Sequence, residues 1–181
     1  MKTPLHIPSP WVVRFAPLVR RDGPVLDLAC GNGRHLRHFA GLGHPVVGVD
    51  IDVRGLADLE GREGIEIVLA DLEGGPWPFG LRRFSAIIVT NYLHRPLLPA
   101  LIDAVEPGGL LLYETFAEGN ERFGRPSSPA YLLKSGELLD AVAGKLQVLA
   151  FEQGEVSSPK AAVVQRLAAI DAADPRPLPA G

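Results

Sequence analysis

The chain has 181 residues, 46% of them hydrophobic, and a formal net charge of −3. This length suits one domain with one core, and the slightly acidic balance excludes an overall basic surface for nucleic acid, although a local basic patch is compatible with it. One cysteine, Cys30, excludes an intrachain disulfide framework, and no apolar run approaches the length of a membrane span. We therefore expect a cytoplasmic protein without membrane segments.

The first residues predict an irregular start followed by a short helix. Residues 1–6 lack the apolar core of a signal peptide, and Pro4, Pro8 and Pro10 disfavour regular structure up to residue 10. Trp11 to Val19 carries apolar residues at helical spacing, and Pro17 is expected to end or bend that helix.

From Pro24 onward the pattern alternates between strand and helix, which predicts a parallel sheet with right-handed crossovers. A helix is expected after Gly33 as far as Gly41, and another near Val53 to Glu60. Phe84 to Thr90 is almost wholly apolar, which is typical of a central strand covered on both faces. The first four strands are predicted at Val25 to Cys30, Pro45 to Asp50, Ile65 to Ala70, and Phe84 to Thr90.

The second half predicts two more helices and three more strands. A helix begins near Pro96, with Leu97, Leu98, Leu101, Ile102 and Val105 on its buried face. Residues 115–134 lose all periodicity, and Ser135 is a candidate cap for a helix through Val142. The remaining strands are predicted at Leu110 to Glu114, Gln147 to Glu152, and Ala161 to Leu167.

The proline-rich tail, residues 172–181, has almost no large apolar side chains and is expected to be disordered or extended. The expected domain therefore spans residues 1–171. The sequence leaves open whether the protein is a monomer or a homodimer.

The segment from Asp27 to Arg34, Asp-Leu-Ala-Cys-Gly-Asn-Gly-Arg, reads as a strand end, a glycine loop and a helix start. Such a loop lets a ligand approach backbone N–H groups at a helix N-terminus. A dinucleotide fingerprint would need a third glycine where Leu36 stands, and Asp27 puts a charge inside the strand. Both features disfavour a nicotinamide-dependent dehydrogenase without excluding it.

Asp27 to Gly33 resembles motif I of the class I methyltransferases that use S-adenosylmethionine, and the Gly-Asn-Gly-Arg loop is most similar to that of small tellurite-resistance-type enzymes. The Pro107-Gly108-Gly109 turn resembles the turn before the fifth strand of that family. The resemblance covers about residues 25–167. It implies an α/β fold, a Rossmann-like doubly wound seven-stranded sheet that is mostly parallel with an antiparallel C-terminal strand, and S-adenosylmethionine as the cofactor.

Three carboxylates, Asp27, Asp50 and Asp71, stand at the ends of predicted strands, and in a doubly wound sheet these ends lie along one crevice. Asp50 can accept hydrogen bonds from two ribose hydroxyls, and Asp71 from an adenine amino group. Ile51 and Leu72 would flank the base. The alternative is that the carboxylates only cap adjacent helices or loops.

The amino-acid end of the cofactor carries an ammonium and a sulfonium, which the buried carboxylate of Asp27 would favour. Arg34 and the loop amides would bind the cofactor carboxylate. Cys30 is expected to be a small loop residue and not a nucleophile, because nothing nearby marks an activated thiolate. The remaining loop residues predicted to contact the cofactor are Ala29, Gly31, Asn32 and Gly33.

Methyl transfer is an in-line displacement that positioning and desolvation can accelerate without a catalytic side chain. If the nucleophile carries a proton, His94 is the best candidate base, because the end of the fourth strand borders the reactive methyl in this fold. Asn91 and Tyr92 would orient the acceptor, and Asn91 would also contact the cofactor. The alternative for His94 is a loop histidine bonded to backbone. Glu114 and Thr115 are weaker candidates.

Several other residues allow two interpretations. Trp11 and Arg14 either touch the amino-acid end of the cofactor or belong to a helix packed on the sheet. Arg122 and Arg125 either recognise an anion or lie in a solvated loop. His35, His38 and His44 lack carboxylates at ligand spacing, so no metal is expected.

A small-molecule acceptor is expected, with an anionic acceptor as one option, because no recognition domain or broad basic surface is evident. One rival is an RNA or protein methyltransferase that docks through Arg82, Arg83, Arg122 and Arg125. Another is a non-catalytic protein that binds the same cofactor.

Overall fold

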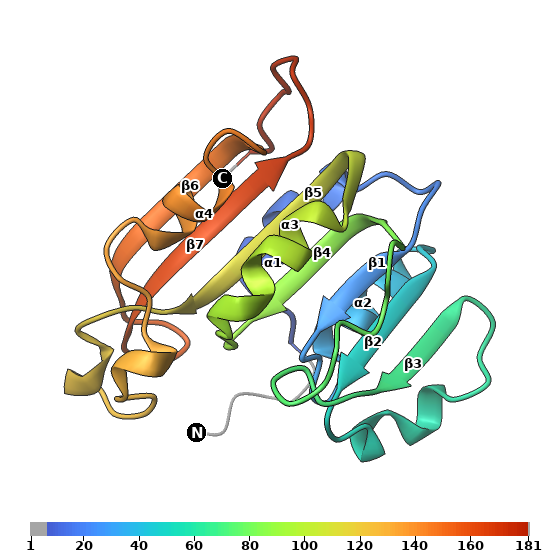
Figure 1. The fold of residues 1–181 in the computed structure, drawn as a ribbon, viewed down its shortest axis with the longest axis horizontal. Coiled ribbons are helices and arrows are strands. Elements are labelled where there is room, and N and C mark those ends of the chain that lie inside the picture. The colour runs from blue at the N-terminus through green and yellow to red at the C-terminus, as the bar shows by residue number, and fades with distance from the viewer. Residues whose placement is uncertain (1–6, 181) are drawn as a thin grey trace.

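The structure is a computed structural model that describes residues 7–180, so the expectations for residues 1–6 lie outside the described residues. A seven-stranded sheet runs through the molecule in the order β3-β2-β1-β4-β5-β7-β6 (Figure 1). Strands β1 to β5 are parallel, whereas β7 is antiparallel to both β5 and β6. This confirms the predicted fold class. The strands are β1 (Val25–Leu28), β2 (Val46–Asp50), β3 (Ile65–Leu69), β4 (Phe84–Thr90), β5 (Val105–Phe116), β6 (Gln147–Val156) and β7 (Ala162–Ile170).

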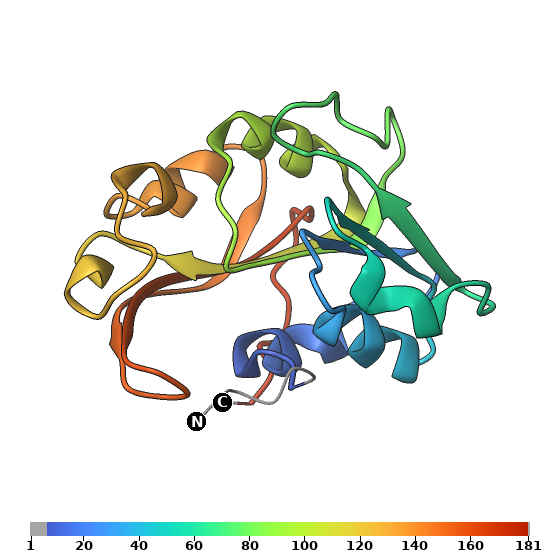
Figure 2. The ribbon, with the colours of Figure 1, turned by 90° about the horizontal axis from the view of Figure 1, so that it is seen from below.

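Helices cover both faces of the sheet (Figure 2). One face is covered by α1 (Pro10–Phe15), α2 (Arg34–Gly41) and the 3-10 turns η1 (Ala16–Leu18) and η2 (Arg54–Leu59). The other face is covered by η3 (Arg95–Leu97), α3 (Leu98–Asp103) and α4 (Glu137–Val142). No helix among residues 7–180 is long and apolar enough to cross a membrane.

Strand β4 lies in the middle of the sheet, and all its residues except Thr90 are buried. Its side chains alternate between two cores, as the two-residue repeat of a strand requires. Ile87 and Val89 join the core under α3 and α4, whereas Ala86 and Ile88 join the core under α1 and α2. The continuous apolar pattern of this strand therefore reflects burial on both faces.

Two predicted elements are shorter or tighter than expected. Strand β1 ends at Leu28 and not at Cys30, because Ala29 takes a left-handed conformation with φ +50°. The helix expected over residues 53–60 is the 3-10 turn η2, whose buried residues Leu56 and Leu59 are three apart. Three residues per turn is the 3-10 repeat, so this spacing buries both side chains on one face.

The predicted position of Val105 in a helix is wrong. Val105 opens β5 and pairs with Phe84, after which the pairing jumps to Ala86 with Leu110. Gly108 lies in this irregular stretch with φ +79°, a conformation that glycine adopts without strain. The Pro-Gly-Gly sequence is therefore a bulge inside β5 and not a turn before it.

The predicted helix cap at Ser135 is also wrong. Helix α4 begins after Gly136, which takes the left-handed conformation, and no side chain caps it. The Ser135 hydroxyl instead accepts a hydrogen bond from Gln153 on β6. Serine is a common N-cap residue, but here its hydroxyl oxygen is hydrogen-bonded to a side chain from a distant strand.

The segment after β5 contains more structure than its sequence predicts. It forms two 3-10 turns, η4 (Asn120–Arg122) and η5 (Pro129–Tyr131), and an isolated bridge between Ala117 and Leu133. The buried side chain of Asn120 bonds the N–H of Val163 on β7 and the carbonyl of Pro126. These contacts hold the segment on the sheet without a long helix or strand.

Candidate functional site

The glycine loop joins β1 to α2 at the carboxyl end of the parallel strands. Gly31 and Gly33 have φ values of +54° and +71°. A Cβ atom on Gly33 would lie 2.5 Å from Cδ2 of Leu56, so a side chain there would also displace η2. Glycine at position 33 thus meets both a backbone and a packing requirement.

Ala29 and Asn91 are the non-glycine residues with positive φ among those described, at +50° and +55°. They follow β1 and β4, which are neighbouring parallel strands, so both strained residues lie at one edge of the sheet. Backbone strain of this kind costs roughly 1–3 kcal/mol and concentrates at ligand sites. Asparagine tolerates this conformation better than alanine does.

Asp27 lies in β1 beneath the glycine loop with 2% of its surface exposed. Its Oδ2 accepts a hydrogen bond of 2.9 Å from the N–H of Leu36, and the imidazole of His35 lies 3.8 Å from Oδ1. Burial raises the pKa of Asp27 to about 7, opposed by the Leu36 N–H and the charge of Arg34. The carboxylate is thus a buried acid that lacks a cation in direct contact among the described residues.

Asp50 ends β2 and ties the glycine loop to that strand. Its Oδ2 accepts a 2.7 Å hydrogen bond from the N–H of Gly31, and Oδ1 accepts one from the N–H of Asp52. These two hydrogen bonds match the alternative interpretation, in which the carboxylate of Asp50 caps adjacent loops. A carboxylate has about four lone-pair positions, so Asp50 can still accept further hydrogen bonds.

Asp71 follows β3 and also organises a loop. Its Oδ1 accepts hydrogen bonds from the N–H groups of Gly74 and Glu73, which lower the pKa of the carboxyl group. The second oxygen makes no protein hydrogen bond among the described contacts. Asp50 and Asp71 thus stand at the carboxyl ends of adjacent strands with acceptor capacity left.

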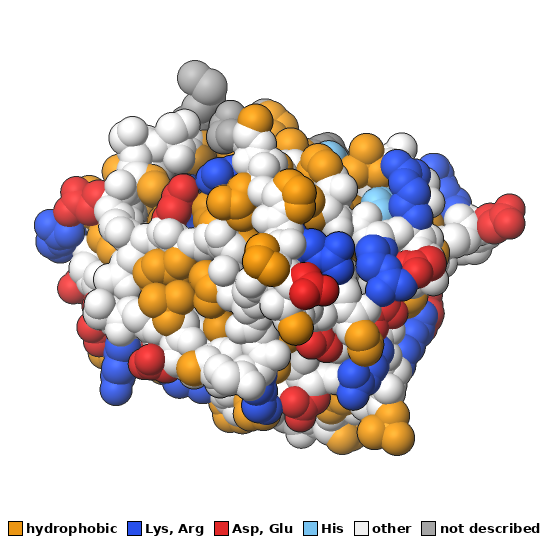
Figure 3. Space-filling model, turned by 90° about the horizontal axis from the view of Figure 1, so that it is seen from above, with side chains coloured by type: hydrophobic (Ala, Val, Ile, Leu, Met, Phe, Trp, Pro, Cys, Tyr) orange, Lys and Arg blue, Asp and Glu red, His pale blue; other side chains and the backbone are white. Residues whose placement is uncertain are grey.

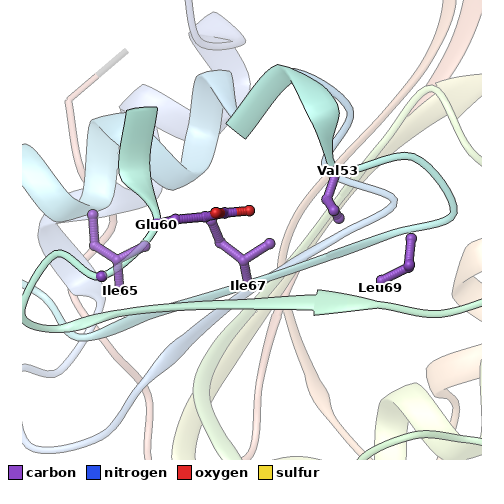
Figure 4. Close-up of a pocket in the computed structure, with 6 residues that line it drawn as sticks. Val53, Glu60, Ile65, Ile67 and Leu69 are labelled. Atoms are coloured by element: carbon purple, nitrogen blue, oxygen red, sulfur yellow. The ribbon is translucent and has the colours of Figure 1, made fainter. Parts of the chain in front are cut away.

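The two residues predicted to flank a base differ in exposure. Ile51 is 68% exposed, whereas Leu72 is buried and belongs to the core that α3 and α4 cover. A shallow pocket of about 330 Å³ opens between η2 and β3, with Val53, Ile67 and Leu69 pointing toward it (Figure 4). The sequence did not predict this pocket, because the helix expected over residues 53–60 is a 3-10 turn whose path the hydrophobic spacing does not report.

Arg34, the first residue of α2, reaches across to β4, where its guanidinium donates a 3.3 Å hydrogen bond to the hydroxyl of Thr90. Thr90 is the first member of a row of directly opposed residues on four neighbouring strands. We call this set the polar row; its members are Thr90 on β4, Glu114 on β5, Arg166 on β7 and Glu152 on β6.

Ion pairs join three members of the polar row, Glu114, Arg166 and Glu152. Arg166 Nε lies 2.5 Å from Glu114, in a pair whose side chains are only 19% and 11% exposed, and Arg166 also contacts Glu152 at 3.1 Å. Arg14 of α1 reaches Glu152 at 3.9 Å. Glu114 was a weak candidate from sequence, and Arg166 was missed, because only strand register reveals their pairing.

The N-terminal helix packs on the sheet. Trp11 is buried, and its indole N–H donates to the carbonyl of Leu167 on β7. The guanidinium of Arg14 stacks over the rings of Trp11 and Phe15. Of the two interpretations for Trp11 and Arg14, these contacts favour the packed helix.

Asn91, Tyr92 and His94 all follow β4 at the same edge of the sheet as the glycine loop. Burial, with the negative charges of Glu73, Asp71 and Asp50, raises the pKa of Tyr92 to about 12. His94 is half-buried, and its charge contributes weakly to the lowered pKa of Asp71.

Arg95, next to His94, was missed by the sequence interpretation. Its guanidinium binds both oxygens of Glu137, at 2.6 and 2.9 Å, and the carbonyls of Ala130 and Leu132. These contacts fasten the segment after β5 and the start of α4 to the end of β4. Nothing in the local sequence marks Arg95, since its partner is 42 residues away.

The predicted docking patch of four arginines does not form. Arg82 and Arg83 precede β4, at the amino end of the sheet, and Arg82 pairs with Glu66 at 2.8 Å. Arg122 and Arg125 follow β5, at the carboxyl end, and Arg122 pairs with Glu155. Figure 3 views the amino-end side, where Lys and Arg side chains alternate with Asp and Glu.

The remaining residues that the sequence analysis considered for the site are Cys30, the histidines and Asn32. Burial raises the pKa of the Cys30 thiol, so it is a poor nucleophile. His38 and His44 pack against the ring of Phe39. Among residues 7–180, no group of three or more His, Cys, Asp and Glu side chains is placed to hold a metal ion. Asn32 is exposed at the tip of the glycine loop.

This seven-stranded fold is shared with solved structures of methyltransferases. Residues 25–109 match the family described as a methyltransferase domain. No curated protein matches the chain.

Solved structures of low sequence identity share the fold. TehB from Haemophilus influenzae is 19% identical with a TM-score of 0.69, over 89% of this chain and 61% of that chain. A methyltransferase from Methanosarcina mazei is 15% identical with a TM-score of 0.69, over 91% and 98%. The 1,6-didemethyltoxoflavin-N1-methyltransferase of Burkholderia thailandensis, solved with S-adenosylhomocysteine, is 20% identical with a TM-score of 0.65, over 88% and 75%.

Proposed function

We propose that this protein is an S-adenosylmethionine-dependent methyltransferase that acts on a small molecule. The observation that carries the proposal is the buried, uncompensated carboxylate of Asp27 beneath a glycine loop whose backbone is held by Asp50. A buried carboxylate without a cation is costly, and a ligand ammonium would compensate it. A structural neighbour with the same fold was solved with S-adenosylhomocysteine, which supports the choice of cofactor.

The residues of the crevice fit the parts of this cofactor. Asp27 would face its ammonium, and Arg34, whose guanidinium makes one bond to Thr90, would bind its carboxylate. Asp50 would accept from the ribose hydroxyls and Asp71 from the adenine amino group, with Ile51 and Leu72 beside the base. Ala29, Cys30, Gly31, Asn32, Gly33 and Asn91 would line the cofactor through their backbone or short side chains.

The acceptor would lie against the polar row, which begins where Arg34 meets Thr90 and continues under α1. The bound cofactor supplies a methyl group activated by positive sulfur, so the chain need only orient the acceptor and exclude water. His94 would take a proton from a protonated nucleophile, and Tyr92 and Asn91 would shape the opening after β4. The paired arginines and glutamates of the polar row would offer both signs of charge to a polar acceptor.

The test is calorimetric titration with S-adenosylmethionine, followed by a methyl-transfer screen of small acceptors. Asp50→Ala and Asp71→Ala should each weaken binding about tenfold, since each removes a hydrogen-bond acceptor for the adenosine. Asp58→Ala, which removes a surface partner of Arg37, is the matched control and should bind normally. A folded wild-type protein that fails to bind would overturn the proposal, and binding without transfer to any acceptor would favour a non-catalytic cofactor-binding protein.

A further inference from the structure

His35 is a buried titratable residue that the proposed function does not use. It lies in the first turn of α2 with 1% of its surface exposed. Its Nε2 accepts a 3.0 Å hydrogen bond from the backbone N–H of Ser9. A nitrogen that accepts a hydrogen bond carries no proton, so the proton of the neutral ring is on Nδ1. That atom faces Asp27 Oδ1 at 3.8 Å.

Ser9 connects this imidazole to the N-terminal helix. Ser9 is itself buried, and its hydroxyl accepts a hydrogen bond from the N–H of Trp11 at the start of α1. Trp11 in turn bonds β7 through Leu167. A chain of contacts therefore runs from Asp27 through His35 and Ser9 to α1, which covers the polar row.

We propose that His35 is a positioning residue that orients the Asp27 carboxylate toward the ammonium of the cofactor and couples its binding to the seating of Ser9 and α1. This inference rests on the proposed function. The 3.8 Å separation is too long for a hydrogen bond, but ionised Asp27 would attract the Nδ1 proton more strongly than the neutral acid does. Binding at Asp27 would then tighten the imidazole, and through it the Ser9 contact.

The charges around the pair are consistent with this arrangement. Burial, with the charges of Arg34 and His38, lowers the pKa of His35 to about 3, so the ring stays neutral and keeps its Nδ1 proton. The groups that act on Asp27 are the Leu36 N–H and Arg34, which favour the charged form, and Asp50, which disfavours it. A cationic ligand would add the missing favourable charge.

The experiment compares two probes by calorimetry: S-adenosylhomocysteine, and 5′-methylthioadenosine, which lacks the amino-acid end. His35→Gln places an amide oxygen where Nε2 accepts from Ser9 but removes the group that faces Asp27. The His35→Gln variant should bind S-adenosylhomocysteine about tenfold more weakly, which is the factor that a single charge-assisted contact provides. Its affinity for 5′-methylthioadenosine should stay within about twofold of the wild type. His38→Gln, on the same helix, is the matched control and should change neither affinity.

Two further readouts separate positioning from simple loss of structure. Proton release on S-adenosylhomocysteine binding, measured in buffers of different ionisation enthalpy, should shift to higher pH in His35→Gln, because Asp27 loses the nearby Nδ1–H dipole, which favours its charged form. His35→Asn, which keeps an amide N–H toward Asp27 and loses the Ser9 bond, should retain most affinity but expose Trp11 in fluorescence quenching.

Equal losses for both probes in His35→Gln, with wild-type proton release, would overturn the positioning role. A wild-type protein that binds 5′-methylthioadenosine but does not prefer S-adenosylhomocysteine would also overturn it, while leaving an adenosine site in place. Failure of the wild type to bind either probe would overturn the proposed function itself.

Discussion

Asp27 gives the ligand-free protein a stability that depends on pH. Its pKa is about 7 in the folded state against 3.8 for an ordinary aspartate, so the folded state holds a proton between these values that the unfolded state has lost. Stability from this group is therefore complete below pH 3.8, declines as pH rises to about 7 and is constant above it. The sign is opposite to that of a salt-bridged aspartate.

Asp27→Asn should remove this dependence. The stability difference between wild type and Asp27→Asn, from urea unfolding at several pH values, should move in favour of the variant by up to about 4 kcal/mol between pH 4 and 7. Asp103→Asn, at an exposed ion pair with Lys145, should show no such trend. A constant difference across this range would contradict the prediction.

At the residue scale, the sequence predicts the location of residues that directly follow a strand. It does not predict the contacts of residues whose partners are far away in the sequence. Asp50 and Asp71 could be placed because a carboxylate after an apolar strand must lie at the sheet edge. Arg166 could not, since its partner Glu114 is 52 residues away and only the register of β5 and β7 brings them together. Arg95 escaped prediction for the same reason.

At the scale of elements, Arg95 holds the segment after β5 in place. It makes four hydrogen bonds to Glu137, Ala130 and Leu132, and both charged side chains are partly buried. Arg95→Met should cost about 2–4 kcal/mol, because Glu137 is left without its cation and two carbonyls lose a donor.

Hydrogen exchange should locate this loss. Amides of residues 126–137 should exchange faster in Arg95→Met, whereas those of β1 and β4 should not change. Lys145→Met, which removes an exposed ion pair, is the matched control and should change stability by less than about 1 kcal/mol. Uniformly faster exchange in Arg95→Met would show that the role is global and not confined to this segment.

The bounds of helices and strands were predicted correctly where one hydrophobic pattern runs through the whole element. They were predicted wrongly where local backbone conformation determines where the element ends. The bounds of β4 were predicted correctly because seven residues share one apolar pattern. The end of β1, the 3-10 character of η2 and the bulge in β5 depend on positive φ values and short-range packing, which hydrophobic spacing does not report.

At the scale of the whole molecule, backbone hydrogen bonds join the end of the chain to the sheet at Asp171, and Ala172 packs against the core next to it. The N–H of Asp171 donates to the carbonyl of Gly109, and its carbonyl accepts from Gly108, whereas residues 173–180 form no helix or strand. We propose that the domain ends here. Removal of residues 173–181 should shift the melting temperature by less than about 2 °C, because little apolar area is lost.

A truncation that also removes Ile170, Asp171 and Ala172 is the contrast. It deletes a buried side chain and both hydrogen bonds to the β5 bulge, so the melting temperature should fall by at least about 5 °C. Differential scanning calorimetry compares the two proteins. A similar fall for both would show that the tail contributes to the domain.

The polar row also constrains how the sheet can assemble. Side chains of a strand alternate between faces, so a slip of one residue in β7 would turn Arg166 toward the core that holds Tyr113 and Leu167. An unpaired guanidinium there would cost several kcal/mol. The ion pairs of the row therefore favour the native register of β5, β7 and β6 over an alignment shifted by one residue.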